Sequence, residues 1–264
     1  MKNFFQQKNE LFNWFYNNQN FNIHKWLNYF EYYNKHFQKY KNYNTSILEI
    51  GVQYGGGAIM WRDYFGKNAK IIGIDINPAI KNLESQGMFI EIGDQNSPDF
   101  WHEFIKKYGP MDIIIDDGGH YMDQQITSFI SLFPHIKTQG TFLCEDTTTS
   151  YWKNYGGGFK RDGTFIEFIK DLIDDIHLSS YKLFETRPFF VDYNPINFYT
   201  TNIDEIIISY AMVFITKEEK EENLYSLENF TDISMCDSIY ISAISGEYYL
   251  SGRSIEPSII INDT

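Results

Sequence analysis

The chain has 264 residues, of which 43% are hydrophobic and 18% aromatic, so it can bury a sizeable core as one large domain. Its 22 Lys and Arg residues against 35 Asp and Glu give a formal net charge of −13. Such an acidic surface repels phosphate backbones, which argues against nucleic-acid binding. The two cysteines, Cys144 and Cys236, are too few for a disulfide framework and wrongly distributed for a zinc site. This cysteine content fits a protein of a reducing compartment.

The sequence predicts a cytoplasmic protein with no membrane span. Its first residues lack the continuous apolar stretch of a signal peptide, so we expect no export. The longest apolar runs have the length of strands and fall well short of the ~18 residues that cross a bilayer. Formation of a homo-oligomer is left open.

Residues 1–44 are dense in aromatic side chains, and their spacing predicts a helical cap. Amphipathic helices are indicated by two groups, Phe12, Phe15 and Tyr16, then Trp26, Leu27 and Phe30. From residue 46 the pattern changes to short runs rich in β-branched residues, separated by helical segments. Four such runs are Ile47–Ile50, Ile71–Ile74, Met88–Ile92 and Asp112–Ile115.

These runs are apolar on successive residues, as expected for parallel strands covered by helices on both faces. A fifth run, Gly140–Cys144, precedes a strongly periodic helix over Phe165–Leu178. Two last runs, Glu205–Ser209 and Met212–Thr216, are too close together for a parallel crossover and should form an antiparallel hairpin at the sheet edge. The predicted fold is a doubly wound α/β sheet of seven strands, mostly parallel and Rossmann-like.

The expected domain organisation has three parts. A helical cap or lid covers residues 1–44, the α/β domain covers 45–217, and a C-terminal extension covers 218–264. The extension begins with the charge run Lys-Glu-Glu-Lys-Glu-Glu and carries no motif that we can interpret, although 239–244 and 248–250 are suited to a strand pair.

A glycine-rich turn, Gly51 to Gly57, follows the first strand and leads into a helix expected to begin near Ala58. Glycines there let a ligand approach the backbone N–H groups of a helix N-terminus. Gln53 stands where the dinucleotide fingerprint needs its second glycine, and Glu49 in the strand disfavours a pyrophosphate. The turn is therefore a poor dinucleotide match.

Carboxylates also end the second and third strands. Asp75 is placed to accept both ribose hydroxyls of an adenosine, and Asp94 to accept from an adenine amino group. Each aspartate taken alone is more often a strand-end or cap residue. Together with Glu49 and the glycine turn they resemble the class I S-adenosylmethionine-dependent methyltransferases, whose sheet also ends in an antiparallel strand. The resemblance implies a cofactor site at Glu49, Gly51, Tyr54, Gly55, Asp75, Asp94 and Asp116.

Acidic residues follow the fourth and fifth strands as well, at Asp116-Asp117 and Glu145-Asp146. Adjacent parallel strands lie about 5 Å apart, so these side chains crowd one crevice unless a cation neutralises them. Asp117, Glu145 and Asp146 are therefore candidate ligands of one divalent ion. An all-oxygen set favours Mg²⁺, Mn²⁺ or Ca²⁺ over zinc, and Mg²⁺ is our preferred ion with Mn²⁺ as its substitute.

His120 lies three residues beyond Asp117 on a glycine-rich turn. Histidine titrates near neutrality, which suits a general base for a hydroxyl. Ile-Asp-Asp-Gly-Gly-His on one strand and Glu-Asp-Thr-Thr-Thr-Ser-Tyr-Trp on the next resemble the metal-dependent sugar O-methyltransferases of the macrolide-sugar, cephalosporin-hydroxylase-like and capsule types. The resemblance implies that Asp117, Glu145 and Asp146 hold Mg²⁺ and that His120 is the base.

The function that follows is Mg²⁺-dependent methylation of a sugar hydroxyl by S-adenosylmethionine. By family analogy, the acceptor is a sugar nucleotide or a precursor of a capsular or surface polysaccharide. Tyr151-Trp152 and the glycines at 156–158 suit an acceptor loop, or equally a hydrophobically anchored surface loop. One alternative is an NAD-dependent oxidoreductase acting on a nucleotide sugar, since Asp75 also suits its ribose. The other is a non-catalytic nucleotide-binding protein.

Overall fold

The computed structural model describes residues 9–177, 197–219, 236–241, 248–252 and 259–261. The chain divides into two compact units, Met1–Glu219 and Lys220–Thr264. Over the described residues we find no helix with the length and apolar character needed to traverse a bilayer. The last residue of the helix predicted over 165–178 and much of the predicted C-terminal extension lie outside the described part of the chain.

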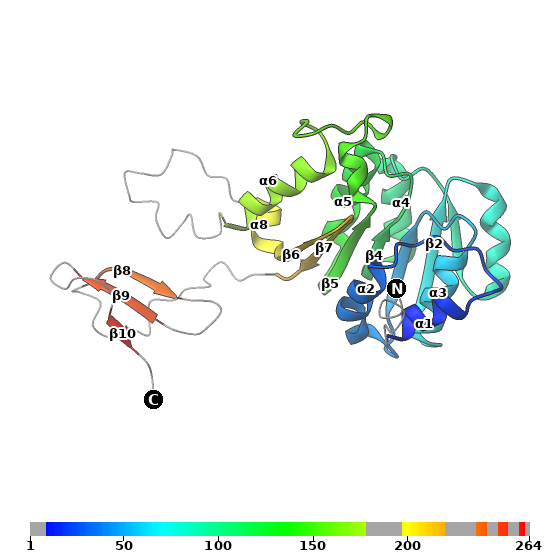
Figure 1. The fold of residues 1–264 in the computed structure, drawn as a ribbon, viewed down its shortest axis with the longest axis horizontal. Coiled ribbons are helices and arrows are strands. Elements are labelled where there is room, and N and C mark those ends of the chain that lie inside the picture. Colours follow the sequence, from blue (N-terminus) through cyan, green and yellow to red (C-terminus); the bar gives the residue numbers. More distant parts are fainter. Residues whose placement is uncertain (1–8, 178–196, 220–235, 242–247, 253–258, 262–264) are drawn as a thin grey trace, which may run out of the picture. The chain divides into compact units, whose positions relative to one another are not determined.

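A seven-stranded sheet forms the centre of the first unit, in the order β3-β2-β1-β4-β5-β7-β6 (Figure 1). Strands β1 to β5 run parallel, while β7 is antiparallel to both of its neighbours, β5 and β6. Their bounds are β1 Ser46–Ile50, β2 Lys70–Asp75, β3 Phe89–Ile92, β4 Met111–Asp116, β5 Ile136–Glu145, β6 Ile203–Ser209 and β7 Met212–Lys217. The predicted α/β sheet with its edge hairpin is confirmed.

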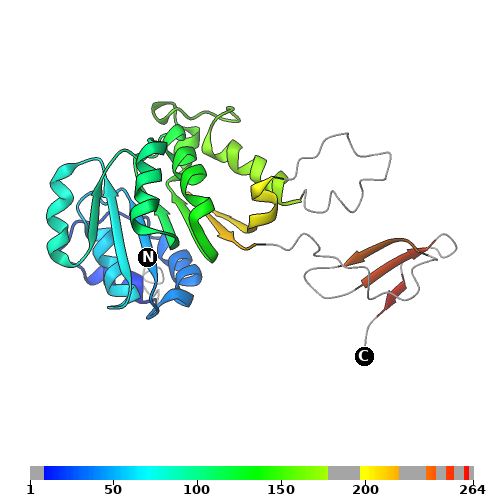
Figure 2. The same ribbon diagram turned by 180° about the vertical axis from the view of Figure 1, so that it is seen from behind.

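Both faces of the sheet are covered, which explains why its strands are apolar on successive residues. On one face, Ile47 and Ile113 pack with α1 Glu10–Asn17, α2 Tyr29–Phe37 and α3 Gly56–Phe65. On the other, Leu48 and Ile114 pack with α4 Pro98–Tyr108, α5 Met122–Leu132 and α6 Phe165–His177. Figure 2 shows the same layers from behind.

The helical cap is present, but its second helix starts later than the sequence predicts. Trp26 and Leu27 precede α2 and are 46% and 40% exposed, because the chain crosses the carboxyl end of the sheet there before turning into the helix. Tyr29 and Phe30 carry the buried face instead. Helix α3 likewise begins at Gly56, ahead of the expected Ala58.

The remaining elements are short. They are the 3₁₀ helices η1 Gln38–Tyr40, η2 Pro78–Gln86, η3 Phe133–His135, η4 Thr147–Tyr151 and η5 Lys153–Tyr155, and the helix α8 Phe198–Asn202. The second unit contains an antiparallel sheet of β8 Cys236–Ile241, β9 Tyr248–Gly252 and β10 Ile259–Ile261. The functional side chains lie in the first unit, where β1, β2, β3, β4 and β5 end.

Candidate active site

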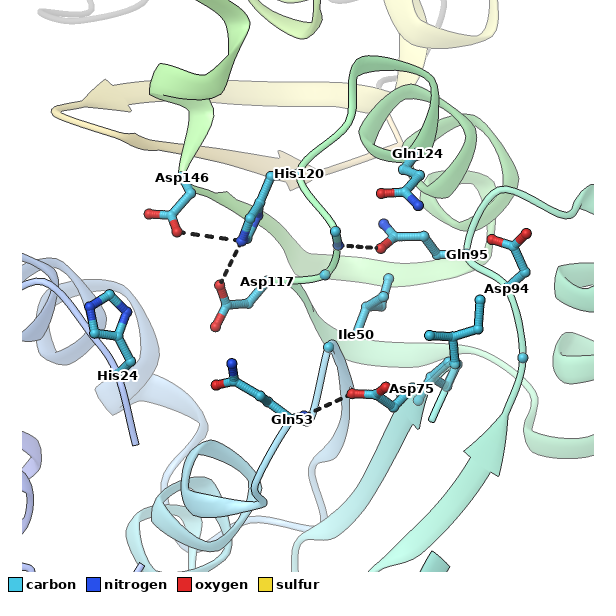
Figure 3. A pocket seen from close by; sticks show the side chains of 16 residues that line it. His24, Ile50, Gln53, Asp75, Asp94, Gln95, Asp117, His120, Gln124 and Asp146 are labelled. Atoms are coloured by element: carbon cyan, nitrogen blue, oxygen red, sulfur yellow. Dashed lines mark hydrogen bonds and ion pairs between the residues drawn. The ribbon is translucent and has the colours of Figure 1, made fainter. Parts of the chain in front are cut away.

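A cavity of about 280 Å³ opens at the carboxyl ends of the parallel strands (Figure 3). Such an edge is where ligands bind in open α/β sheets, because the strand ends and loops leave a crevice there. Of the predicted cofactor residues, Gly51, Asp75 and Asp94 line it. Asp117, His120 and Asp146 line the same cavity, so the structure brings cofactor and metal candidates together.

The glycine turn contains two residues in the left-handed backbone conformation. Gly51 has φ +86°, and a Cβ there would lie 2.1 Å from the carbonyl oxygen of Asp117, so only glycine fits. Gln53 also has a left-handed φ of +51°, the conformation for which a glycine is usual. Its N–H donates to Asp75 Oδ2 at 2.8 Å, which connects the turn to the end of β2.

The open part of the acidic cluster consists of Asp117, His120 and Asp146. His120 Nε2 lies 3.5 Å from Asp146 Oδ2 and 3.9 Å from Asp117 Oδ1 (Figure 3). One ligand atom from each of the three residues lies within 4.8 Å of the others. The second oxygen of each carboxylate is engaged elsewhere: Asp117 Oδ2 with Lys25, and Asp146 Oδ1 with Tyr29. The two remaining oxygens therefore point into one shared space.

The backbone holds this cluster in a strained form. His120 has φ +59° and Asp146 has φ +52°, values that non-glycine residues rarely adopt. The hydroxyl of Thr149 donates to the His120 carbonyl at 3.0 Å and connects the loops after β4 and β5. His120 Nδ1 is buried without a hydrogen-bond partner among the described residues, while Nε2 faces the carboxylates.

Glu145, the third predicted metal ligand, does not join the open cluster. Its Oε1 accepts from the hydroxyl of Tyr33 at 2.6 Å and its Oε2 accepts from Lys25 Nζ at 2.9 Å. Burial would lower the pKa of the Lys25 ammonium, but the carboxylates of Asp117 and Glu145 outweigh burial and raise it above its ordinary value. A lysine therefore stands between two of the three predicted ligands.

Comparison with known proteins relates this chain to methyltransferases. Residues 48–147 match a family described as a methyltransferase domain. The chain is 38% identical to demethylmacrocin O-methyltransferase of Streptomyces fradiae and to mycinamicin VI 2''-O-methyltransferase of Micromonospora griseorubida. Each match covers 154 residues, which are 54% of this chain and 38% of the relative. The chain thus spans about two fifths of the length of these relatives.

A solved structure supports the same assignment. The MycE methyltransferase from the mycinamycin biosynthetic pathway, in complex with Mg and SAH, matches with a TM-score of 0.65 at 29% identity. The match covers 77% of this chain and 52% of MycE. This chain contains a region that matches a methyltransferase domain and resembles the class I sugar O-methyltransferases. The predicted family resemblance is confirmed.

The other predicted cofactor residues of the methyltransferase domain lie beside the cavity without lining it. Tyr54 is 66% exposed outside it, and Gly55 caps the start of α3. Asp116 is buried, and its Oδ1 accepts from Gly118 N at 3.2 Å and from the Gln95 amide at 3.1 Å. Burial raises the pKa of Asp116 to about 7.

Gln95 is a lining residue that the sequence analysis missed. Its amide donates to Asp116, and its Oε1 accepts from Gly119 N at 2.8 Å, so it shapes the turn that carries His120. A Cβ on Gly118 would lie 1.9 Å from this Oε1, which explains the glycine at that position. The only sequence signal for Gln95 is its place directly after Asp94 at the end of β3.

Glu49 lies under the glycine turn of the methyltransferase domain. Its Oε1 accepts from Trp61 Nε1 at 3.0 Å, and its Oε2 has no partner within the described part of the chain. Burial raises the pKa of Glu49 to about 7, from an ordinary value near 4.5. A carboxyl whose folded pKa is raised binds its proton more tightly in the native state, so its contribution to stability is lost as pH rises between these values.

Replacement of Glu49 by glutamine should remove that pH dependence. We expect the free energy of unfolding of the variant, relative to the unchanged protein, to increase by about 2 kcal/mol between pH 5 and pH 8. Urea unfolding at both pH values measures this difference, and the pH dependence from Asp116 cancels because both proteins contain it. A difference that is the same at both pH values would contradict the raised pKa of Glu49.

Proposed function

We propose that this protein transfers a methyl group from S-adenosylmethionine to a sugar hydroxyl with the help of a divalent cation, Mg²⁺ or Mn²⁺. The observation that carries the proposal is the convergence of Asp117, His120 and Asp146 on the cavity that Asp75 and Asp94 also line. The relatives described above are O-methyltransferases, which supports the reaction class. MycE, whose structure holds Mg and SAH, supports the cofactors.

The residues present fit a Mg²⁺ ion. Asp117 Oδ1 and Asp146 Oδ2 are hard oxygen donors, each held in place by hydrogen bonds to the other oxygen of its carboxylate. Two carboxylates are a usual protein contribution to a Mg²⁺ site, which keeps further positions for water or substrate. We therefore propose that Asp117 and Asp146 hold the cation.

The chemistry assigns a role to each remaining side chain. S-adenosylmethionine supplies an electrophilic methyl group, and a bound cation lowers the pKa of the acceptor hydroxyl. His120 Nε2 takes the hydroxyl proton while the acceptor oxygen bonds to the methyl carbon and the carbon–sulfur bond breaks. Nε2 lies 3.5 Å from Asp146 Oδ2 and 3.9 Å from Asp117 Oδ1, so the base would stand beside the ligands of the cation. Asp75 and Asp94, which line the same cavity, would bind and orient the nucleoside of S-adenosylmethionine.

For the acceptor we propose a sugar nucleotide or a precursor of a capsular or surface polysaccharide. The relatives named above act on macrolide glycosides, but they match this chain over only two fifths of their length. A shared fold alone does not determine a substrate, so these relatives do not fix the acceptor of this chain. A glycosylated macrolide is therefore the comparison substrate in the assay below.

Calorimetric titration of S-adenosylmethionine and of NAD⁺, each with Mg²⁺ and after chelation, tests the reaction class. We expect S-adenosylmethionine to bind and NAD⁺ not to bind. Sugar nucleotides, polysaccharide precursors and a macrolide glycoside are then screened by mass spectrometry for the gain of one methyl group. Binding of NAD⁺ alone would overturn the proposal in favour of an oxidoreductase, and binding without methyl transfer to any acceptor would favour a nucleotide-binding protein.

An aromatic surface next to His120 is suited to the acceptor. Tyr155 has its ring centroid 6.4 Å from His120, 5.3 Å from Tyr121 and 5.9 Å from Trp152. Tyr121 and Trp152 are 47% and 51% exposed, so their faces are free to stack on a sugar ring. This surface combines the predicted loop residue Trp152 with Tyr155, which the sequence analysis did not select.

Replacement of Trp152 by alanine should raise the KM for the acceptor about 3- to 10-fold, since an aromatic contact contributes about 0.5–1.5 kcal/mol. Affinity for S-adenosylmethionine should stay unchanged because Trp152 does not line the cofactor cavity. The matched control is Tyr210→Ala, at a 67% exposed tyrosine between β6 and β7. If both variants have the same KM for the acceptor, Trp152 does not contribute to acceptor binding.

A further inference from the structure

A basic loop lies in the segment that connects β5 to α6 (Figure 1). The loop, residues 153–161, carries Lys153, Lys160 and Arg161 and no acidic residue, although the whole chain has a formal net charge of −13. The nearest acidic residue in the sequence is Asp162. All three cations are exposed, and none forms an ion pair with any residue that the structure describes. The basic loop therefore has positive charge to offer to a ligand.

The backbone of the basic loop packs against the segments that form the active site. Gly157 N donates to the carbonyl of Trp152 at 2.9 Å. A Cβ on Gly157 would lie 2.3 Å from the carbonyl oxygen of Thr149, so glycine permits a close approach there. Thr149 in turn donates its hydroxyl to the carbonyl of His120 at 3.0 Å. These contacts make the basic loop part of the rim around the proposed catalytic base.

The guanidinium of Arg161 is close to this packed turn and has open donors. Its Nη1 donates to the Gly157 carbonyl at 3.5 Å, and among the described residues its side chain makes no other hydrogen bond. A guanidinium is a planar fork that can bind two oxygens of one phosphate. The ammonium of Lys160, the preceding residue, lies 5.7 Å from the ring centroid of Phe159. Both cations are available to an anion.

The cavity and the basic loop have opposite charge. Four aspartates line the cavity, namely Asp75, Asp94, Asp117 and Asp146. Their charge suits a cofactor with a positive sulfonium and a divalent cation, and it repels an anionic group. An acceptor that combines an uncharged sugar with an anionic group would therefore place the sugar toward His120 and the anion toward the basic loop.

We propose that the basic loop binds the diphosphate of an activated sugar, with Lys153, Lys160 and Arg161 as the phosphate contacts. The inference rests on the proposed function and narrows its acceptors to sugars that carry a diphosphate. The aromatic surface supports this arrangement, because Tyr155 lies 6.4 Å from His120 and 5.9 Å from Trp152 between ring centroids. The reactive hydroxyl, the sugar ring and the diphosphate would then meet the base, the aromatic surface and the basic loop.

An anionic lipid bilayer is the competing partner for such a loop. Phe159 is 80% exposed, and exposed aromatic and basic side chains together also suit a membrane surface. The formal net charge of −13 opposes the approach of this chain to a negatively charged bilayer, whereas a small diphosphate needs only the local positive charge. The observations therefore favour the diphosphate.

Titration of UDP-glucose with the full chain, followed by ³¹P nuclear magnetic resonance, tests the proposal because it observes the diphosphate directly. Saturating S-adenosylhomocysteine keeps the nucleotide out of the cofactor cavity, and a chelator removes divalent ions that would themselves bind phosphate. We expect K160M/R161M to bind UDP-glucose at least about 10-fold more weakly than the unchanged protein. The matched control K106M/K107M loses two exposed lysines of α4, and so the same charge, and should bind as the unchanged protein does.

A second variant, K153M/K160M, keeps the contact between Arg161 and Gly157 and so guards against a rearranged loop. It should also bind UDP-glucose more weakly than the control. Inorganic pyrophosphate, tested in the same way, should lose affinity in both variants. If either variant binds UDP-glucose as the control does, the proposal is overturned. Loss of UDP-glucose binding with unchanged pyrophosphate binding would overturn it too, because the contacts would then be to the nucleoside or the sugar.

Sedimentation with vesicles of phosphatidylglycerol and phosphatidylcholine tests the competing partner. We expect the unchanged protein to stay in solution. Sedimentation with the vesicles that K160M/R161M abolishes and the control K106M/K107M retains would assign the basic loop to a membrane surface and would overturn the diphosphate site.

The proposed function can fail separately. Methyl transfer to a glycoside without phosphate, together with no binding of UDP-glucose or pyrophosphate, would overturn the diphosphate site and keep the methyltransferase. Binding of UDP-glucose that depends on the basic loop, without methyl transfer to any acceptor, would support the diphosphate site and refute the proposed function.

Discussion

Replacement of His120 by alanine is expected to lower turnover by about 10²- to 10⁴-fold, the usual contribution of a general base. The imidazole Nε2 lies between the free oxygens of Asp117 and Asp146, so its loss removes the proton acceptor and leaves both carboxylates in place. Affinity for S-adenosylmethionine and for Mn²⁺ should therefore stay close to that of the unchanged protein. Steady-state kinetics, calorimetry and Mn²⁺ titration on one preparation measure all three quantities.

The matched control is His102→Ala, at an exposed histidine on α4. It should leave turnover unchanged. A drop in Mn²⁺ affinity that parallels the drop in turnover of the His120 variant would make His120 a metal ligand. Unchanged turnover would reject any role for this ring in proton transfer.

The approximate positions of the parallel strands along the chain could be predicted because their causes are local. Runs such as Ile71–Ile74 are apolar on successive residues, which is typical of strands buried on both faces. The carboxyl ends of parallel strands lie on the same side of the sheet, and this places Asp75, Asp94 and Asp117 together however the covering helices pack. The carboxylates can be recognised in the sequence because each lies at the end of a strand or within two residues after it.

The rest of the site could not be predicted, because it depends on contacts between distant segments. Lys25 is separated from its partners Asp117 and Glu145 by 92 and 120 residues in the sequence, and no hydrophobic periodicity predicts contacts at such a separation. The structure also shows why a missing glycine at Gln53 is tolerated: the residue adopts the left-handed conformation and its N–H is bonded to Asp75. A conformational cost of this kind persists only where the surrounding contacts compensate it.

Neighbouring carboxylates can also have different roles in ways that spacing does not reveal. Asp116 and Asp117 are adjacent, yet the first is turned into the sheet toward Gln95 and the second faces the cavity. Glu145 and Asp146 differ in the same way. Tyr33 and Lys25 bind the Glu145 carboxylate in the protein interior, whereas the left-handed backbone at Asp146 directs its side chain toward the cavity. In each pair the second residue lines the cavity and the first does not.

Replacement of Asp146 by asparagine should therefore abolish most of the divalent binding. Changes in residues that only support a metal ligand typically cost about 10- to 100-fold in metal affinity, so loss of a ligand carboxylate should cost more than about 100-fold. Asparagine keeps the shape and can still accept from Trp26 and Tyr29, which now engage Oδ1, so the loss would report charge at the ligand position instead of unfolding.

Turnover of the Asp146 variant should fall with its Mn²⁺ affinity and recover in part at high Mn²⁺, whereas the His120 variant should show no such recovery. Asp99→Asn, at an exposed aspartate in the first turn of α4, is the matched control and should bind Mn²⁺ normally. If Asp146→Asn binds Mn²⁺ as tightly as the control, the ion is not held at the end of β5. The cluster of Asp117, His120 and Asp146 would then act by proton transfer and charge alone.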